Sequence, residues 1–343
     1  MEENSTTISM QNDAASLGIK ENGGAISHFR LHEDGINPLS FRMRQDDNGD
    51  AYFEGHFICL PRWGDPSPGE KKAGLHKHGS FSRMPWNIYR EGNKTYMQAT
   101  SGREGITLNR ILTLDPQQAC FEVEEKITNF HALGCLYDMV QHPTLAAPFL
   151  SADTIVDCNA TTGFDNDRKS YDKKDFTEWP NVISRQGATI NLSRPGRPAY
   201  SGVYSFIVNP MQTWGWITAY APQHRLLIGY IWKRKDYPWI NMWLHYEEDR
   251  LLYRGLEFGA SGMHKPFHEM LDLNLIHLLN EKTCLYLDAG GQEIRRYYCF
   301  LQKTPPGYNG VQQVEIKDTH FVIREKGTAA AIYLPHSFNL NQS

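Results

Sequence analysis

The sequence has no uninterrupted apolar run long enough to cross a bilayer, no excess of one charge sign and no paired cysteines. A membrane-spanning helix needs about 20 consecutive apolar residues, and the 343 residues contain no such run. The formal net charge is -4, with both signs mixed along the chain, so the sequence offers no basic stripe for a nucleic-acid backbone or a membrane surface. The opening MEENSTT is acidic and polar, unlike a signal peptide. We therefore expect a soluble, cytoplasmic protein whose partners include neither nucleic acid nor a membrane.

The six cysteines are scattered and form no CxxC pair, which disfavours a zinc site or a redox pair. Most of them have apolar neighbours in the sequence, so we expect buried free thiols. They are Cys59, Cys120, Cys135, Cys158, Cys284 and Cys299.

Long amphipathic helices are also scarce, whereas strand patterns are frequent. Several segments alternate apolar and polar residues or are rich in β-branched and aromatic residues, and Gly, Pro, Asn and Asp separate them. Examples are residues 121–128, 214–220, 225–232 and 295–301. Only residues 267–280 resemble a helix. This pattern predicts an all-β fold, a large antiparallel β-sandwich.

No change in composition marks a linker between domains. We therefore predict a disordered stub over residues 1–12, a single sandwich domain over 13–334 that carries the site, and a polar tail over 335–343. The stretch 165–178 is dense in Asp and Lys and is expected to be an exposed loop near that site.

The segment GLHKHGSFSRMPW at residues 74–86 combines two imidazoles, an arginine and a tryptophan. Imidazole and guanidinium groups offer fixed donors for hydroxyls, and an indole gives the C–H face of a sugar ring an apolar surface. The segment is typical of a site for a polyhydroxylated ligand. Its candidate binding residues are His76, His78, Arg83 and Trp86.

Three later segments add candidates. His142 follows an alternating strand and precedes a proline that ends the ladder, so it is expected at a strand end. Trp239 shares one strand face with Asn241 and Trp243, which predicts one core face and one aromatic face. Glu257 lies on a strand among small residues that leave room for a ligand.

Together these motifs resemble the galactose mutarotase-like (aldose 1-epimerase) superfamily. Members carry a His-Gly segment leading to Arg-x-Pro-Trp, then a His-Pro segment, then a Gly-x-Glu segment after a Pro-x-x-x-x-Trp strand. The matching residues are His78-Gly79 with Arg83, Pro85 and Trp86, then His142-Pro143, then Gly255 to Glu257 after Pro238 to Trp243. The resemblance spans roughly residues 15–303. It departs from the family after the glutamate, where Phe258-Gly259 stands. The family's sugar-binding aspartate has no clear counterpart in the motifs, and Asp236 is named as its candidate.

The resemblance implies a supersandwich fold and an enzyme that interconverts the anomers of an aldose or a sugar derivative. Glu257 would act as the base and His142 as the acid, while His78 and Arg83 would bind hydroxyls and Trp86 or Trp239 would stack on the sugar ring. Ring opening requires only this proton transfer, so we expect no cofactor and no metal. The partner is a small-molecule sugar.

Three alternatives stay open from the residues. A carbohydrate-binding or regulatory protein would use the same fold without turnover. His76 and His78 alternate on a strand as in metal-binding HxH pairs, with Glu54, His56 or Glu91 completing the shell. The basic residues Lys233 and Arg234 would suit a uronate or a sugar phosphate.

Overall fold

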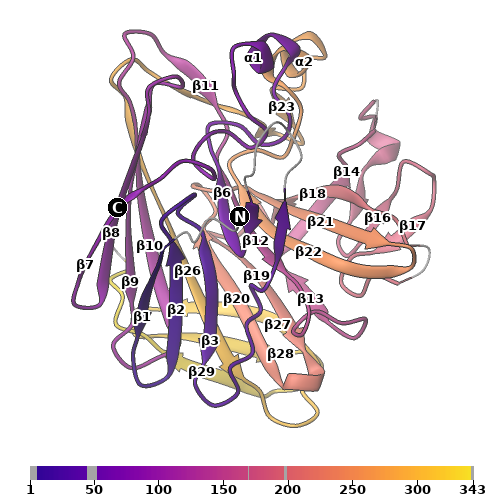
Figure 1. The fold of residues 1–343 in the computed structure, drawn as a ribbon. Coiled ribbons are helices and arrows are strands. Elements are labelled where there is room, and N and C mark those ends of the chain that lie inside the picture. The colour runs from indigo at the N-terminus through magenta and orange to yellow at the C-terminus, as the bar shows by residue number, and fades with distance from the viewer. Residues whose placement is uncertain (1–5, 45–51, 169, 197–198, 341–343) are drawn as a thin grey trace.

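The computed structural model describes residues 6–44, 52–168, 170–196 and 199–340, and most of them belong to antiparallel strands. A ten-stranded sheet has the order β1 (Thr7–Gln11), β2 (Ala15–Lys20), β3 (Ile26–Leu31), β6 (His56–Cys59), β12 (Val140–Leu145), β22 (Arg250–Gly259), β21 (Trp239–Glu247), β18 (Gly202–Val208), β14 (Ala160–Asp165), β15 (Thr177–Glu178). An eight-stranded sheet has the order β13 (Ile155–Cys158), β19 (Trp214–Ala221), β20 (Leu226–Lys233), β26 (Gln292–Lys303), β10 (Cys120–Asn129), β9 (Ile106–Leu114), β8 (Lys94–Ser101), β7 (Asn87–Glu91). The expected all-β sandwich is confirmed (Figure 1).

The main core lies between these two sheets. Strand β9 alternates buried and half-buried residues along its whole length, as expected for a strand with one face on the core. Strand β12 differs, because all six of its residues are buried. It is a central strand, and its outer face is covered as well as its inner face. That outer face carries the site described below.

A third sheet packs on the outer side of the eight-stranded sheet. Its strands are β27 (Val311–Lys317), β28 (His320–Glu325) and β29 (Ala331–Pro335). Phe321 of β28 and Tyr298 of β26 belong to the same buried cluster, with ring centroids 6.1 Å apart. The added sheet therefore gives β26 a second apolar interface.

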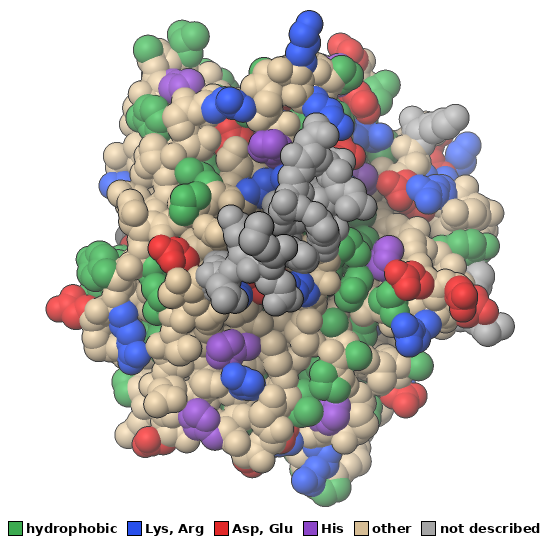
Figure 2. Space-filling view, in the orientation of Figure 1, with side chains coloured by type: hydrophobic (Ala, Val, Ile, Leu, Met, Phe, Trp, Pro, Cys, Tyr) green, Lys and Arg blue, Asp and Glu red, His purple; other side chains and the backbone are tan. Residues whose placement is uncertain are grey.

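Smaller elements complete the fold. The two-stranded sheets are β4 (Arg42–Arg44) with β5 (Tyr52–Glu54), β11 (Cys135–Tyr137) with β25 (Leu285–Leu287), β16 (Asn181–Ile183) with β17 (Thr189–Asn191), and β23 (His277–Leu278) with β24 (Glu281–Lys282). The helices are α1 (Pro68–Lys72), α2 (Phe267–Asp272) and 3-10 turns at Lys173–Asp175 and Pro222–His224. No helix in the described ranges has the length and hydrophobicity to cross a membrane. On the face drawn in Figure 2, acidic and basic side chains are interspersed.

The structure corrects both predicted chain ends where they are described. Residues 7–11 form strand β1, paired with β2, and Met10 is fully buried, so this part of the predicted stub is ordered by its core contact. In the predicted tail, Phe338 and Leu340 are buried against the third sheet. Isolated apolar residues within polar segments anchor both ends. Residues 1–5 and 341–343 lie outside the described residues.

Two local predictions are only partly right. Of the segment 267–280, only Phe267–Asp272 is helical, and a turn and the short strand β23 follow. The stretch 165–178 begins buried: the amide of Asn166 donates to the Ser205 hydroxyl (2.6 Å) and to the Gly262 carbonyl (2.7 Å). These bonds tie the beginning of the predicted exposed loop to the large sheet.

Candidate active site

His142 and Glu257 meet on the outer face of the ten-stranded sheet. They lie on the neighbouring strands β12 and β22, whose antiparallel register pairs Val140 with Gly259 and Thr144 with Gly255. The same register sets His142 beside Glu257, and His142 Nε2 lies 3.1 Å from Glu257 Oε1. Both side chains are nearly inaccessible, with 6% and 1% of their surface exposed. Strand pairing thus joins two groups that are far apart in the sequence.

The pair lies in a cavity of about 360 Å³. This volume is within the range of small-molecule sites, roughly 300–1,000 Å³. Seven of the fourteen lining residues are apolar, five of them aromatic, and six others are titratable. The lining residues are Phe41, Met43, Phe53, Phe57, Trp63, Gly64, Asp65, Lys77, His78, His142, Val203, Trp243, Glu257 and His264.

Burial governs the protonation of the pair. Loss of solvation raises the pKa of Glu257 well above its usual range, and the nearby Trp63 side chain acts in the opposite direction. Loss of solvation also lowers the pKa of His142 to about 3, against a bond to its own backbone. Both shifts favour the uncharged groups, so the pair holds one proton on the carboxyl side. This differs from the charged resting pair that mutual attraction would give.

His78 enters the cavity from a tight loop. The residue has φ 61°, and the following Gly79 has φ 76°, where an added Cβ would lie 1.8 Å from the Leu60 carbonyl oxygen. The backbone N–H of Gly64 donates to His78 Nδ1 at 3.2 Å. Burial lowers the pKa of His78 well below its usual range. The neutral ring therefore carries its proton on Nε2, as a donor for a ligand oxygen.

Aromatic rings hold His142 from two sides. The Phe57 ring stacks on the imidazole with centroids 4.2 Å apart and planes 20° apart. Trp243 presents its ring at 68°, with its centroid 5.9 Å away. The strand pattern predicts Trp239 and Trp243 on one face, and only Trp239 is among the predicted site residues, whereas Trp243 is the one that lines the cavity. No motif pointed to Phe57.

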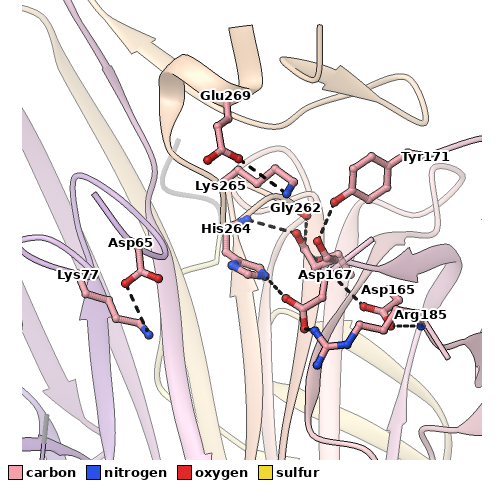
Figure 3. A network of polar contacts seen from close by, with 12 residues as sticks. Asp65, Lys77, Asp165, Asp167, Tyr171, Arg185, Gly262, His264, Lys265 and Glu269 are labelled. Atoms are coloured by element: carbon pink, nitrogen blue, oxygen red, sulfur yellow. Dashed lines mark hydrogen bonds and ion pairs between the residues drawn. The ribbon is translucent and has the colours of Figure 1, made fainter. Parts of the chain in front are cut away.

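The cavity rim carries a polar network, drawn in Figure 3. His264 Nε2 lies 3.2 Å from Asp167 Oδ1, and Asp167 Oδ2 lies 2.9 Å from an Arg185 nitrogen. On the opposite side, Lys77 Nζ lies 3.8 Å from Asp65 Oδ1. Lys77 belongs to the segment 74–86 and Asp167 to the stretch 165–178 expected near the site, but none of these residues is among the predicted site residues. Only the folded chain brings them together.

Five predicted binding residues lie outside the set that lines this cavity. Trp86 is a core residue: its indole donates to the Phe81 carbonyl at 2.9 Å, and the Arg110 guanidinium lies 4.9 Å from its ring. Trp239 is also fully buried, and its indole donates to the Lys282 carbonyl at 2.7 Å. The alternating pattern identified their strand faces but not the segments that cover those faces. Neither indole offers a stacking surface to a sugar in this cavity.

The other three predicted binding residues lie outside the cavity lining at three different places. The Arg83 guanidinium lies 5.6 Å from the ring of Phe53, so Arg83 contacts a lining residue but does not itself line the cavity. His76 lines a separate cavity of about 150 Å³. Asp236 uses its backbone carbonyl to accept from Arg295, and burial raises the pKa of its carboxyl.

The structure separates the two histidines that the alternative metal site requires. His76 and His78 line different cavities, although the strand pattern placed them on one face. Within the described ranges, no three His, Cys, Asp or Glu side chains are grouped so as to hold a metal ion.

No protein-family model and no curated protein matches the chain. Solved structures do. A galactose mutarotase related enzyme from Lactobacillus acidophilus is 11% identical, with a TM-score of 0.62 over 87% of this chain and 98% of the other. A galactose mutarotase-like protein from Clostridium acetobutylicum is 11% identical, with a TM-score of 0.62 over 88% and 96%. A candidate aldose 1-epimerase from Escherichia coli K12 is 15% identical, with a TM-score of 0.60 over 87% and 99%. The chain has the galactose mutarotase-like fold.

Proposed function

We propose that this chain is an isomerase of the aldose 1-epimerase type, which opens and recloses a cyclic sugar hemiacetal by acid–base catalysis. The observation that carries the proposal is the 3.1 Å contact between His142 Nε2 and Glu257 Oε1 inside a cavity of about 360 Å³. A carboxyl and an imidazole that share one proton are the two groups that ring opening needs. The fold of the solved mutarotase-like proteins agrees with this assignment.

The reaction is a balanced exchange of protons. The proton held on Glu257 passes to His142 Nε2, and the imidazolium gives it to the ring oxygen as the bond between C1 and that oxygen breaks. The Glu257 carboxylate takes the proton of the anomeric hydroxyl, and the C1–O bond becomes a carbonyl. Rotation about C1–C2 and the reverse steps yield the other anomer. No oxidation occurs, and each proton transfer contributes a factor on the order of 10²–10⁴.

The remaining lining residues suit a sugar. The Nε2–H of His78 is a donor for a hydroxyl or for the developing oxyanion. The ring of Trp243 offers an apolar surface for the C–H face of a pyranose. Apolar walls also exclude water, which strengthens the polar contacts inside. The substrate class is therefore a free aldose or a sugar derivative with an unsubstituted anomeric hydroxyl.

Exchange between anomers tests the proposal directly. Saturation-transfer NMR or polarimetry across a panel of free, phosphorylated, deoxy and uronic sugars should detect catalysis by the wild type for at least one member. Glu257→Gln should reduce that rate by a factor on the order of 10²–10⁴ with the same far-UV circular dichroism. Glu91→Gln, on the exposed edge strand β7 of the other large sheet, is the matched control and should keep the full rate.

The same panel separates the enzyme from a carbohydrate-binding protein. A binding protein would bind a sugar, detected by thermal shift, and leave the exchange between its anomers at the spontaneous rate. Unchanged rates in Glu257→Gln and in His142→Gln would also rule out the mechanism.

A further inference from the structure

Thr144 lies two residues after His142 on strand β12, on the same face of the sheet, and is fully buried. Its hydroxyl oxygen is 2.9 Å from His142 Nδ1 and 3.4 Å from the backbone carbonyl oxygen of His142. Its backbone N–H donates to the Gly55 carbonyl at 3.0 Å, which fixes the strand at this point. Thr144 therefore touches the imidazole nitrogen that faces away from Glu257.

These contacts favour one tautomer of His142. If Nδ1 carries the ring hydrogen, it donates to Thr144 Oγ1 at 2.9 Å, and the Thr144 hydroxyl hydrogen is available for the His142 carbonyl oxygen at 3.4 Å. If Nε2 carries the ring hydrogen, the Thr144 hydroxyl donates to Nδ1 and the bond to the carbonyl is lost. The first arrangement keeps both contacts, so the hydrogen is assigned to Nδ1. A neutral imidazole has one N–H, and the lone pair therefore lies on Nε2, 3.1 Å from Glu257 Oε1.

The other neighbours of His142 do not provide this hydrogen bond. Phe57 and Trp243 restrict the ring by packing and have no acceptor group to offer Nδ1. His78 lies 5.9 Å from His142 between ring centroids, and Lys77 acts on His142 as a like charge. Among the described residues, Thr144 contacts Nδ1 of the ring and Glu257 contacts Nε2.

We propose that Thr144 is a positioning residue that holds His142 as the Nδ1–H tautomer, so that Nε2 exchanges a proton with Glu257 and then with the ring oxygen of the substrate. This inference rests on the proposed function for the last step only. Without the Thr144 hydroxyl, Nδ1 loses an acceptor that also stabilises the imidazolium, and the other tautomer gains population.

Nitrogen NMR tests the tautomer without any substrate. In ¹⁵N-histidine-labelled wild type, the signals of His142, assigned by their loss in His142→Gln, should show a protonated Nδ1 and an unprotonated Nε2 at neutral pH. Thr144→Val removes the hydroxyl at nearly constant volume and should shift the ring toward the Nε2–H tautomer. Thr144→Ser keeps the hydroxyl and should retain the wild-type pattern. A protonated Nε2 in the wild type, or a wild-type pattern in Thr144→Val, would overturn the assignment.

Kinetics then separate positioning from packing. Thr144→Val should lower kcat roughly tenfold with little change in KM, because one hydrogen bond to a charged intermediate is lost. It should also displace the acidic limb of the pH–kcat profile to lower pH, while Thr144→Ser restores both. Equal impairment of the Ser and Val variants would leave only a packing role and contradict the proposal. If the wild type turns over no sugar, the proposed function fails, while the NMR result still tests the tautomer. If Thr144→Val does not fold, the spectra of the wild type and of Thr144→Ser test the tautomer assignment.

Discussion

Gln141 and His142 are neighbours on strand β12, yet they point to opposite faces of the sheet and enter two very different polar clusters. On the core face, the Gln141 amide donates to Glu125 at 2.6 Å and to the Tyr237 hydroxyl at 3.2 Å. Arg110 completes this cluster, with one of its nitrogens 2.7 Å from Glu125 Oε1. On the cavity face, His142 meets Glu257. One strand thus separates a structural cluster from a candidate catalytic one.

Glu125 and Glu257 differ in how many of their carboxyl oxygens have a hydrogen-bond partner. Both carboxylate oxygens of Glu125 accept hydrogen bonds, Oε1 from Arg110 and Oε2 from Gln141. Glu257 Oε1 faces His142, whereas Oε2 is buried with no hydrogen-bond partner among the described residues. Burial is common to both glutamates and does not distinguish the candidate site. Glu257 differs from Glu125 because it lines a cavity and lies beside His142.

The largest effect should come from disabling the cavity pair. Glu257→Gln and His142→Gln should each reduce kcat for the active sugar by a factor on the order of 10²–10⁴, and the double variant should lose little more than the worse single variant. When two residues act as one proton-sharing unit, the losses of activity caused by their single substitutions do not add in free energy. Steady-state polarimetry of the four proteins measures this. If the rate reduction of the double variant equals the product of the two single reductions, the two groups act independently.

Substitution of the core residue Glu125 should lower stability, whereas substitution of Glu257 should mainly lower activity. Glu125→Gln removes the charge that compensates buried Arg110, so the free energy of unfolding should fall by about 3 kcal/mol. Glu257→Gln should change the free energy of unfolding by no more than about 1 kcal/mol, because burial keeps the Glu257 carboxyl uncharged. Urea unfolding of both variants checks the contrast. A larger loss in Glu257→Gln would make that residue structural.

Substitutions of Trp243 and Trp239 should show the same contrast between cavity and core, with a smaller change in sugar binding than the change in kcat expected for the cavity pair. Trp243→Leu should weaken binding of the active sugar roughly tenfold, since a stacking contact contributes about 0.5–1.5 kcal/mol. Trp239→Leu should instead lower the melting temperature, because that ring fills the core beside Phe164. Calorimetric titration and thermal melting distinguish them. Equal sugar affinity in wild type and Trp243→Leu would remove Trp243 from the binding surface.

A further expected effect is on the pH dependence of stability. The pKa of His142 falls to about 3 in the folded protein, whereas an unfolded histidine titrates near 6.5. The folded state then binds fewer protons between these values, so the His142 contribution to stability is lost as the pH falls from about 6.5 toward 3. The raised pKa of Glu257 acts in the opposite sense. His142→Gln should therefore lose less stability than the wild type between pH 7 and about 4.5, measured by urea unfolding; an equal loss would contradict the shift.

Strand alternation predicted the sandwich, because it depends on local chemistry. The resemblance to the mutarotase-like superfamily implied the pairing of His142 with Glu257. Neither of them predicted which aromatic residues line the cavity. Trp239 and Trp243 share a strand face, and only tertiary packing determines that one lies under residues 263–284 and the other faces the cavity. Likewise, the strand of Thr7–Gln11 could not be recognised, since its single fully buried residue, Met10, depends on a partner strand and on Thr95.

A crystal structure with the active aldose bound tests the central claim most directly. The account predicts the anomeric oxygen within hydrogen-bonding distance of Glu257, about 2.6–3.2 Å, and the ring oxygen at the same distance from His142 Nε2. A sugar bound in this cavity with its anomeric carbon directed away from both groups, or bound elsewhere on the protein, would contradict it.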